Sequence, residues 1–180
     1  DELRLGGMLS GHSENLNHRE LRGAILALAW LGVWDIKEIN TLLSITMNET
    51  YETQLQGSFS DLGVSLGVKV SKFPRDIKAG LINEFPWELV SIEKGNVKFN
   101  THVNAILKTY TSASYEDLQW MANQIAQIDE PILRHCLSFS GWPNYVQELY
   151  LYKLAERRKQ ILTVFGIEDS RPIVINRMYS

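Results

Sequence analysis

Residues 17–34 read NHRELRGAILALAWLGVW, and the eleven residues from Ala24 to Trp34 are all apolar. A helix that is apolar on every side has to be enclosed by protein, and this run is too short to cross a bilayer. Asn17 is a good N-cap, and Glu20, three residues on, can complete a capping box. The sequence therefore predicts a helix over 17–34 at the centre of the fold.

The composition is that of a chain that folds around a hydrophobic core. It has 180 residues, of which 44% are hydrophobic, enough for one ordinary domain or two small ones. The net charge of −3 supplies no overall attraction to nucleic acid or anionic lipid, so any such binding must be local and no membrane contact is expected. The single cysteine, Cys136, cannot form an internal disulfide, which indicates an intracellular location, cytoplasmic or nucleoid-associated. Its neighbours Ile132, Leu133 and Leu137 predict a buried thiol.

Two more helices are expected after the central one. Over 35–45, Asp35 and Glu38 form a capping-box pair ahead of an apolar stripe. The second helix covers 48–63 and ends at Gly63. The apolar positions of the two segments are Ile36, Ile39, Leu42 and Leu43, then Tyr51, Leu55, Phe59 and Leu62.

The middle of the chain mixes strand and helix patterns. Residues 64–71 alternate between apolar and small or polar side chains, as in a half-buried strand. Residues 74–85 begin at a proline and predict a helix. Residues 87–100 contain two strand-like halves around the turn at 94–96, which predicts a β-hairpin.

From residue 100 onward the pattern is helical. Four helices are expected, over 100–110, 114–128, 129–141 and 143–166, the last ending at Gly166. Ser114 with Asp117 is the capping signal of the helix over 114–128, and Asp129 is that of the helix over 129–141. We therefore expect a mainly α protein of the α+β class with a β-hairpin in its N-terminal half and a helical C-terminal half.

The chain divides into a lobe over 1–110 and a helical lobe over 111–180, unless the two form a single domain over 1–180. No internal repeat or linker separates them. The division is placed where the mixed pattern gives way to helices.

The stretch DIKEINTLLSITMNETYETQLQGSFSDLG, residues 35–63, resembles the helix-turn-helix of winged-helix proteins. The resemblance lies in Glu38 before Ile39, the pair Leu42 and Leu43, Ile45 before the turn, and the apolar positions up to Gly63. It implies a winged-helix-like N-terminal half, with a hairpin as the wing, in a DNA-binding or regulatory protein. The would-be recognition helix, however, carries Glu49 and Glu52 and no Lys or Arg. We therefore do not expect this helix to read DNA by itself.

Positive charge is concentrated in two other segments. Residues 67–110 hold seven bases against four acids, a local charge of +3, and residues 153–159 add a second cluster. Such clusters can hold the phosphates of duplex nucleic acid, although a solvated surface is the alternative for each cluster alone. The case for phosphate binding depends on the two lying on one face. The candidate nucleic-acid-binding residues are Lys69, Lys72, Arg75, Lys78, Lys94, Lys98, Lys153, Arg157, Arg158 and Lys159.

The final helix supports a second hypothesis. Tyr145, Leu149 and Tyr152 make one apolar stripe along it, and Val146 with Tyr150 makes another. A helix that is apolar on two faces can be shared between its own domain and a partner. The alternative function is therefore a protein-interaction module that binds a protein partner or forms a homodimer without contacting nucleic acid.

Catalysis is the third hypothesis and has the weakest basis. The sequence contains no Gly-x-Ser-x-Gly motif, no phosphate-binding glycine loop, and no Glu-x-Lys on an expected strand, so an enzyme such as a nuclease would need a site assembled from distant residues. His18 and Glu20 share the first helix but point to different faces, which does not favour a metal site. No catalytic residue, metal or cofactor is expected.

Overall fold

The computed structural model describes residues 2–6, 18–33, 40–47, 50–72, 75–93, 96–99 and 113–174. The described helices are α1 (Arg19–Trp30), α3 (Tyr115–Ala126), α4 (Glu130–Ser138) and α5 (Asn144–Val164), with a short 3-10 turn at Ile82–Glu84. The strands are β1 (Glu2–Gly6), β2 (Thr41–Met47), β3 (Thr53–Phe59), β4 (Val68–Lys72), β5 (Arg75–Ala79), β6 (Val90–Glu93) and β7 (Asn96–Phe99). The prediction of a mixed α+β fold is confirmed.

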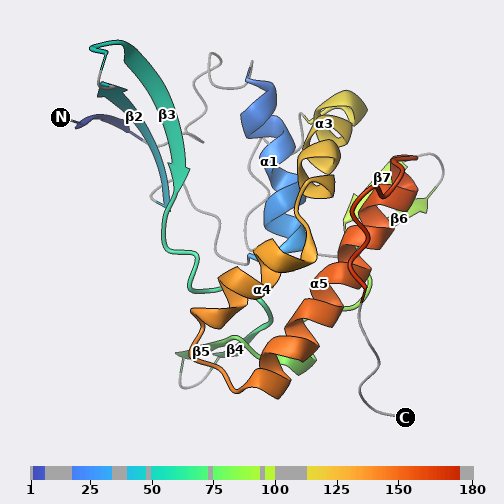
Figure 1. The fold of residues 1–180 in the computed structure, drawn as a ribbon. Helices are drawn as coiled ribbons and strands as arrows, with labels where there is room; N and C mark the ends of the chain where they lie inside the picture. Colours follow the sequence, from blue (N-terminus) through green and yellow to red (C-terminus); the bar gives the residue numbers. More distant parts are fainter. Residues whose placement is uncertain are drawn as a thin grey trace.

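All strand pairing in the described residues is antiparallel. One sheet has the order β1-β2-β3, and β4-β5 and β6-β7 form two separate hairpins. Figure 1 shows the three-stranded sheet extending away from the helices, with the β4-β5 hairpin below it and the β6-β7 hairpin on the other side of α5. The hydrophobic core therefore lies among the helices, and the strands form one sheet and two hairpins around it.

Helix α1 is the centre of the fold, as its apolar run predicts. Leu26 and Ala29 are fully buried, and the Trp30 indole N–H donates to the Leu154 carbonyl at 3.0 Å. One core cluster contains side chains of α1, of the segment around Phe85, and of α3, α4 and α5. Residues from both halves of the chain thus share a single core.

The helix ends earlier than the sequence predicts. Leu31 is the C-cap, and Gly32 follows in the left-handed region with φ +62°. The Val33 N–H donates to Leu28 O and the Gly32 N–H to Ala29 O, both at 2.9 Å, which is a Schellman motif. The glycine therefore stops the helix although the letters on either side remain apolar. At the other end the N-cap is His18, and Asn17 lies outside the described residues.

The two helices expected over 35–63 are wrong wherever the structure describes this stretch. β2 and β3 pair in unbroken register from Thr41 opposite Phe59 to Met47 opposite Thr53, so the helix-turn-helix pattern falls on a β-hairpin. A spacing of four residues is also an even spacing, so it places Leu55 and Phe59 on one face of a strand as well as on one face of a helix. Residues 34–39, with the first capping pair, lie outside the described residues.

The helix expected over 74–85 is also wrong. Residues 75–79 form β5, which pairs with β4 from Val68 opposite Ala79 to Lys72 opposite Arg75. A one-turn 3-10 segment follows at Ile82–Glu84. Cross-strand hydrogen bonding has overridden the weak apolar periodicity of this segment.

Several local signals are confirmed. The hairpin expected over 87–100 is present as β6-β7. Ser114 and Asp117 form the capping box of α3, and the Asp129 carboxylate accepts the Ile132 N–H at the start of α4.

Cys136 is exposed, so the predicted buried thiol is wrong. The helix expected over 100–110 lies outside the described residues, and no described helix is long and apolar enough to cross a membrane.

Candidate nucleic-acid interface

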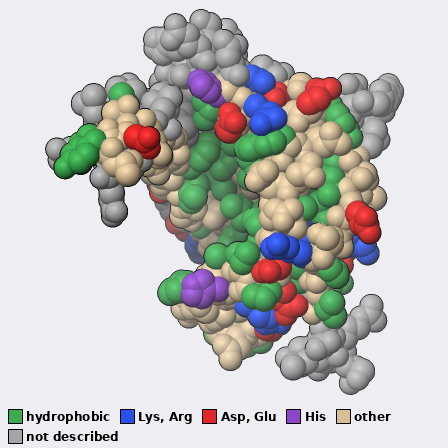
Figure 2. Space-filling view, turned by 45° about the horizontal axis from the view of Figure 1, so that its top comes forward, with side chains coloured by type: hydrophobic (Ala, Val, Ile, Leu, Met, Phe, Trp, Pro, Cys, Tyr) green, Lys and Arg blue, Asp and Glu red, His purple; other side chains and the backbone are tan. Residues whose placement is uncertain are grey.

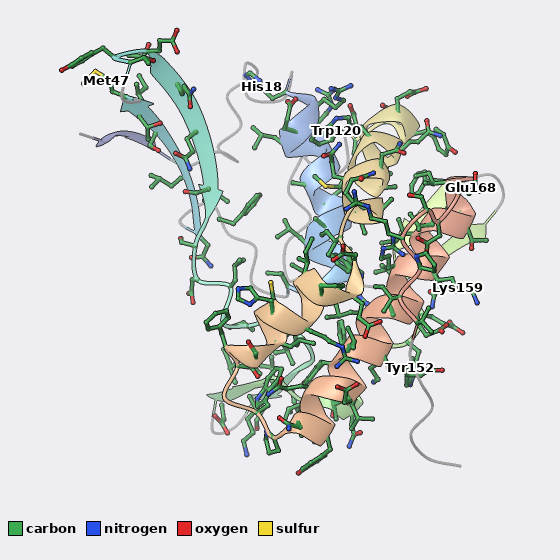
Figure 3. All side chains as sticks on the ribbon, viewed as in Figure 1. His18, Met47, Trp120, Tyr152, Lys159 and Glu168 are labelled. Atoms are coloured by element: carbon green, nitrogen blue, oxygen red, sulfur yellow. The ribbon has the colours of Figure 1, made fainter. Side chains whose placement is uncertain are left out.

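The basic cluster of α5 is not an exposed patch. The exposed fractions of Lys153, Arg157 and Arg158 are 7%, 1% and 1%, and only Lys159 is exposed. Figure 3 shows Lys159 and Tyr152 on the outer side of α5. The expectation that folding brings these bases to the surface is wrong for three of the four.

Arg157 has a structural role at the end of α1. Its guanidinium donates to Trp30 O at 3.0 Å, to Ala29 O at 2.6 Å and to Pro86 O at 2.5 Å, and it lies over the Phe85 ring. The last carbonyls of a helix have no partner within the helix, and a basic side chain can supply one. Burial lowers the pKa of Arg157. Its hydrogen-bonding capacity is used inside the protein.

Arg158 does the same for α3. It donates to Ile125 O at 3.3 Å and Ala126 O at 2.8 Å, and it holds the Asp169 carboxylate through two bonds of 2.6 and 2.8 Å. Its Asp169 partner has a lowered pKa, chiefly because of this hydrogen bonding. Two consecutive residues of α5 therefore cap two different helices.

Lys153 is held by the segment that precedes β6. Its ammonium donates to Ile82 O at 2.5 Å and Phe85 O at 2.6 Å and lies 4.8 Å from the centre of the Trp87 ring. Burial, and secondarily the charge of Arg157, lowers the pKa of Lys153. This lysine is not available to an external phosphate either.

Among the candidate residues with described side chains, the β4-β5 hairpin contributes two exposed bases. Its ladder sets Lys69 opposite Lys78 and Lys72 opposite Arg75, with Asp76 as the one acid in the two strands. Lys69 and Lys78 are exposed, while the side chains of Lys72 and Arg75 lie outside the described part. Asp76 contacts Lys78 at 3.7 Å, but both side chains are more than half exposed, so this ion pair is weak.

The base of the hairpin is fixed to the core. The Leu66 N–H donates to Leu31 O, and Leu66 O accepts the Tyr150 hydroxyl, both at 3.0 Å. Gly67 has φ +95°, and a Cβ there would lie 2.0 Å from Leu81 O, so only glycine fits. The strands of the hairpin are thus exposed, while its base is held by hydrogen bonds and packing against the core.

A groove of about 760 Å³ opens beside this hairpin. Lys69, Ser71, Asp76 and Lys78 line one side of it, and the other side comes from the segment after β5 and the start of α5. Ser71 and Asn83 are not among the site residues predicted from the sequence. The alternation over 64–71 places Lys69 and Ser71 on one face of a strand, but the facing segment 75–79 was predicted to be helical.

The remaining candidates do not join this element. Lys94 lies outside the described residues, and Lys98 is placed only by its backbone, opposite Ser91 in β6-β7. That hairpin lies far from β4-β5 in Figure 1. Figure 2 shows a further face on which basic side chains are scattered among acidic ones. The candidate interface is therefore confined to β4-β5.

The outer face of α5 is a second surface of interest. Tyr145, Leu149 and Tyr152 are 62%, 48% and 39% exposed, whereas Tyr150 is fully buried. Trp87 packs edge-on against Tyr152 with ring centres 5.2 Å apart. The two apolar stripes expected for this helix are thus present, one facing the core and one facing outward.

The described residues contain no group of three His, Cys, Asp or Glu side chains suited to a metal ion. Comparison of the chain with protein-family models, curated proteins and solved structures finds no match.

Proposed function

We propose that this chain is a non-catalytic nucleic-acid-binding component that contacts phosphates through the β4-β5 hairpin. The observation that supports this proposal is the register, which sets the exposed bases Lys69 and Lys78 directly opposite each other. Like charges facing across an antiparallel pair are destabilising, by roughly 0.2–1 kcal/mol each. A polyanion bound along the hairpin would neutralise these facing charges, so the repulsion between them would be replaced by attraction to the phosphates.

The anchored base of the hairpin strengthens the proposal. An isolated two-stranded ribbon is marginally stable, and this one is exposed along much of its length. Its attachment at Leu66 and Gly67 holds the charges in place before any ligand arrives. Less ordering is then required on binding.

Fluorescence anisotropy with labelled oligonucleotides tests this function. Two phosphate contacts, made by Lys69 and Lys78, give a slope of about −1 to −2 in log K against log salt. The double variant K69A/K78A should weaken binding about tenfold or more and make the slope shallower. K159A, which removes an exposed lysine of α5, is the matched control and should bind like the wild type. Equal binding by K69A/K78A and the wild type would refute the proposal.

The exposed stripe of α5 favours a second candidate, homodimerisation through Tyr145, Leu149 and Tyr152. Arg134 on the α4 side of the stripe is paired within the chain to both Glu130 and Glu148. The exposed apolar stripe beside these ion pairs suits a second copy of this chain.

Sedimentation equilibrium over a range of concentrations tests this candidate. The wild type should show a concentration-dependent dimer, and L149R should remain monomeric. A wild type that stays monomeric at every concentration would exclude it.

A further inference from the structure

We infer that the groove beside the β4-β5 hairpin receives an unstacked nucleobase, so that single-stranded nucleic acid is the preferred ligand. This inference rests on the proposed function. It adds which form of nucleic acid the hairpin selects.

The hairpin turns its polar face to the groove. Side chains alternate between the two faces of a strand, so Lys69 and Ser71 lie on the same face as their cross-strand partners Lys78 and Asp76. These four residues line the groove. Directly opposite residues have Cβ atoms about 5 Å apart, which lets both ammonium groups reach one phosphate.

The facing side of the groove contains an apolar surface. Leu81, Ile82, Trp142 and Val146 form it, beside the polar residues Asn83 and Glu84. Trp142 is held by stacking on Tyr150, with ring centres 4.4 Å apart and an angle of 17° between the rings. Gly80 has φ +67°, and a Cβ there would lie 2.9 Å from the Trp142 ring, so the glycine lets the indole approach the hairpin base. The wall is rigid and suited to the flat face of a base.

The groove has the size and the polar groups that a nucleotide needs. Its volume of about 760 Å³ is in the range of small-ligand sites. Lys69 and Lys78 supply positive charge on the hairpin side, while Asp76 and Glu84 also line the groove. A nucleotide within a strand adds the apolar contact of its base and the phosphates on either side. A base inside a duplex is stacked and cannot enter.

The test compares a labelled 12-nucleotide single strand with the matching duplex, both at low salt. The wild type should bind the single strand about tenfold tighter. V146W fills the groove and should lose this preference by weakening single-strand binding about tenfold, with duplex binding unchanged. L149W places the same side chain on the outer face of α5 and should behave like the wild type.

The outcomes separate the two proposals. Equal affinity for single strand and duplex, or a V146W variant that keeps the preference, would overturn the groove inference and leave the hairpin proposal standing. Absence of binding to either form would remove both. If circular dichroism shows that V146W is unfolded, N83W, which fills the groove from the exposed 3-10 turn, decides the question by the same criteria.

Discussion

Replacing Arg157 with methionine tests whether α5 holds the fold together through its buried charges. Methionine fills similar space but donates no hydrogen bond, so Trp30 O and Pro86 O lose the donor that Arg157 supplies, while Ala29 O keeps the Gly32 N–H. An orphaned buried carbonyl costs roughly 1–3 kcal/mol, part of which is offset because a charge no longer has to be desolvated. We expect a net loss of about 3–5 kcal/mol in the free energy of unfolding, out of the ~5–15 kcal/mol of a typical domain.

Urea unfolding followed by tryptophan fluorescence measures this loss. The control is R134M, because Arg134 is an exposed arginine whose ion pairs with Glu130 and Glu148 should contribute less than about 1 kcal/mol. For a chain of this length, the Arg157 change also predicts a melting temperature lower by roughly 6–20 °C. If R157M unfolded at the same urea concentration as R134M, the structural role assigned to Arg157 would be wrong.

Two further outcomes follow from the structure. G67A should lower the free energy of unfolding by about 2–4 kcal/mol in urea, because the φ of +95° and the 2.0 Å distance from the added Cβ to Leu81 O leave no room for a side chain. The control G141A, with φ +71° and nothing within 4 Å of an added Cβ, should lower it by only about 1 kcal/mol. Equal losses in the two variants would contradict the tight packing at Gly67. The pKa of Asp117 is lowered to about 2, chiefly by the hydrogen bond from Arg22, so its ionised form contributes stability that is fully present above the unfolded-state pKa of about 3.9 and is lost as the pH falls through the folded-state value. D117N should therefore flatten the dependence of unfolding free energy on pH between pH 5 and 2, and an unchanged dependence would contradict the assignment.

The helices of the core were predictable because their signals are local. Ser114 with Asp117, Asp129, and Gly166 act within one turn of the helix end that they mark. The apolar run in α1 likewise needs no knowledge of the rest of the chain. Elements of this kind are defined by short-range chemistry that the letters show directly.

The strands over 41–59 and 75–79 were missed because their stabilisation comes from pairing with another segment. Leu55 and Phe59 satisfy a helix and a strand pattern equally well, and only the partner strand decides between them. The same reason explains the error over Arg157 and Arg158. Their charge indicates a surface position, whereas the acceptors that allow their burial lie on α1 and α3, far away in the sequence.

The pairing of Arg157 with α1 has a consequence for how the protein forms during synthesis. The atoms that it joins belong to residues 127 and 128 positions apart. The end of α1 and its apolar surface are therefore made long before the side chain that completes them. During synthesis, part of the apolar surface of α1 therefore stays exposed until both α3 and α5 have emerged from the ribosome. Exposed apolar surface favours aggregation during that interval.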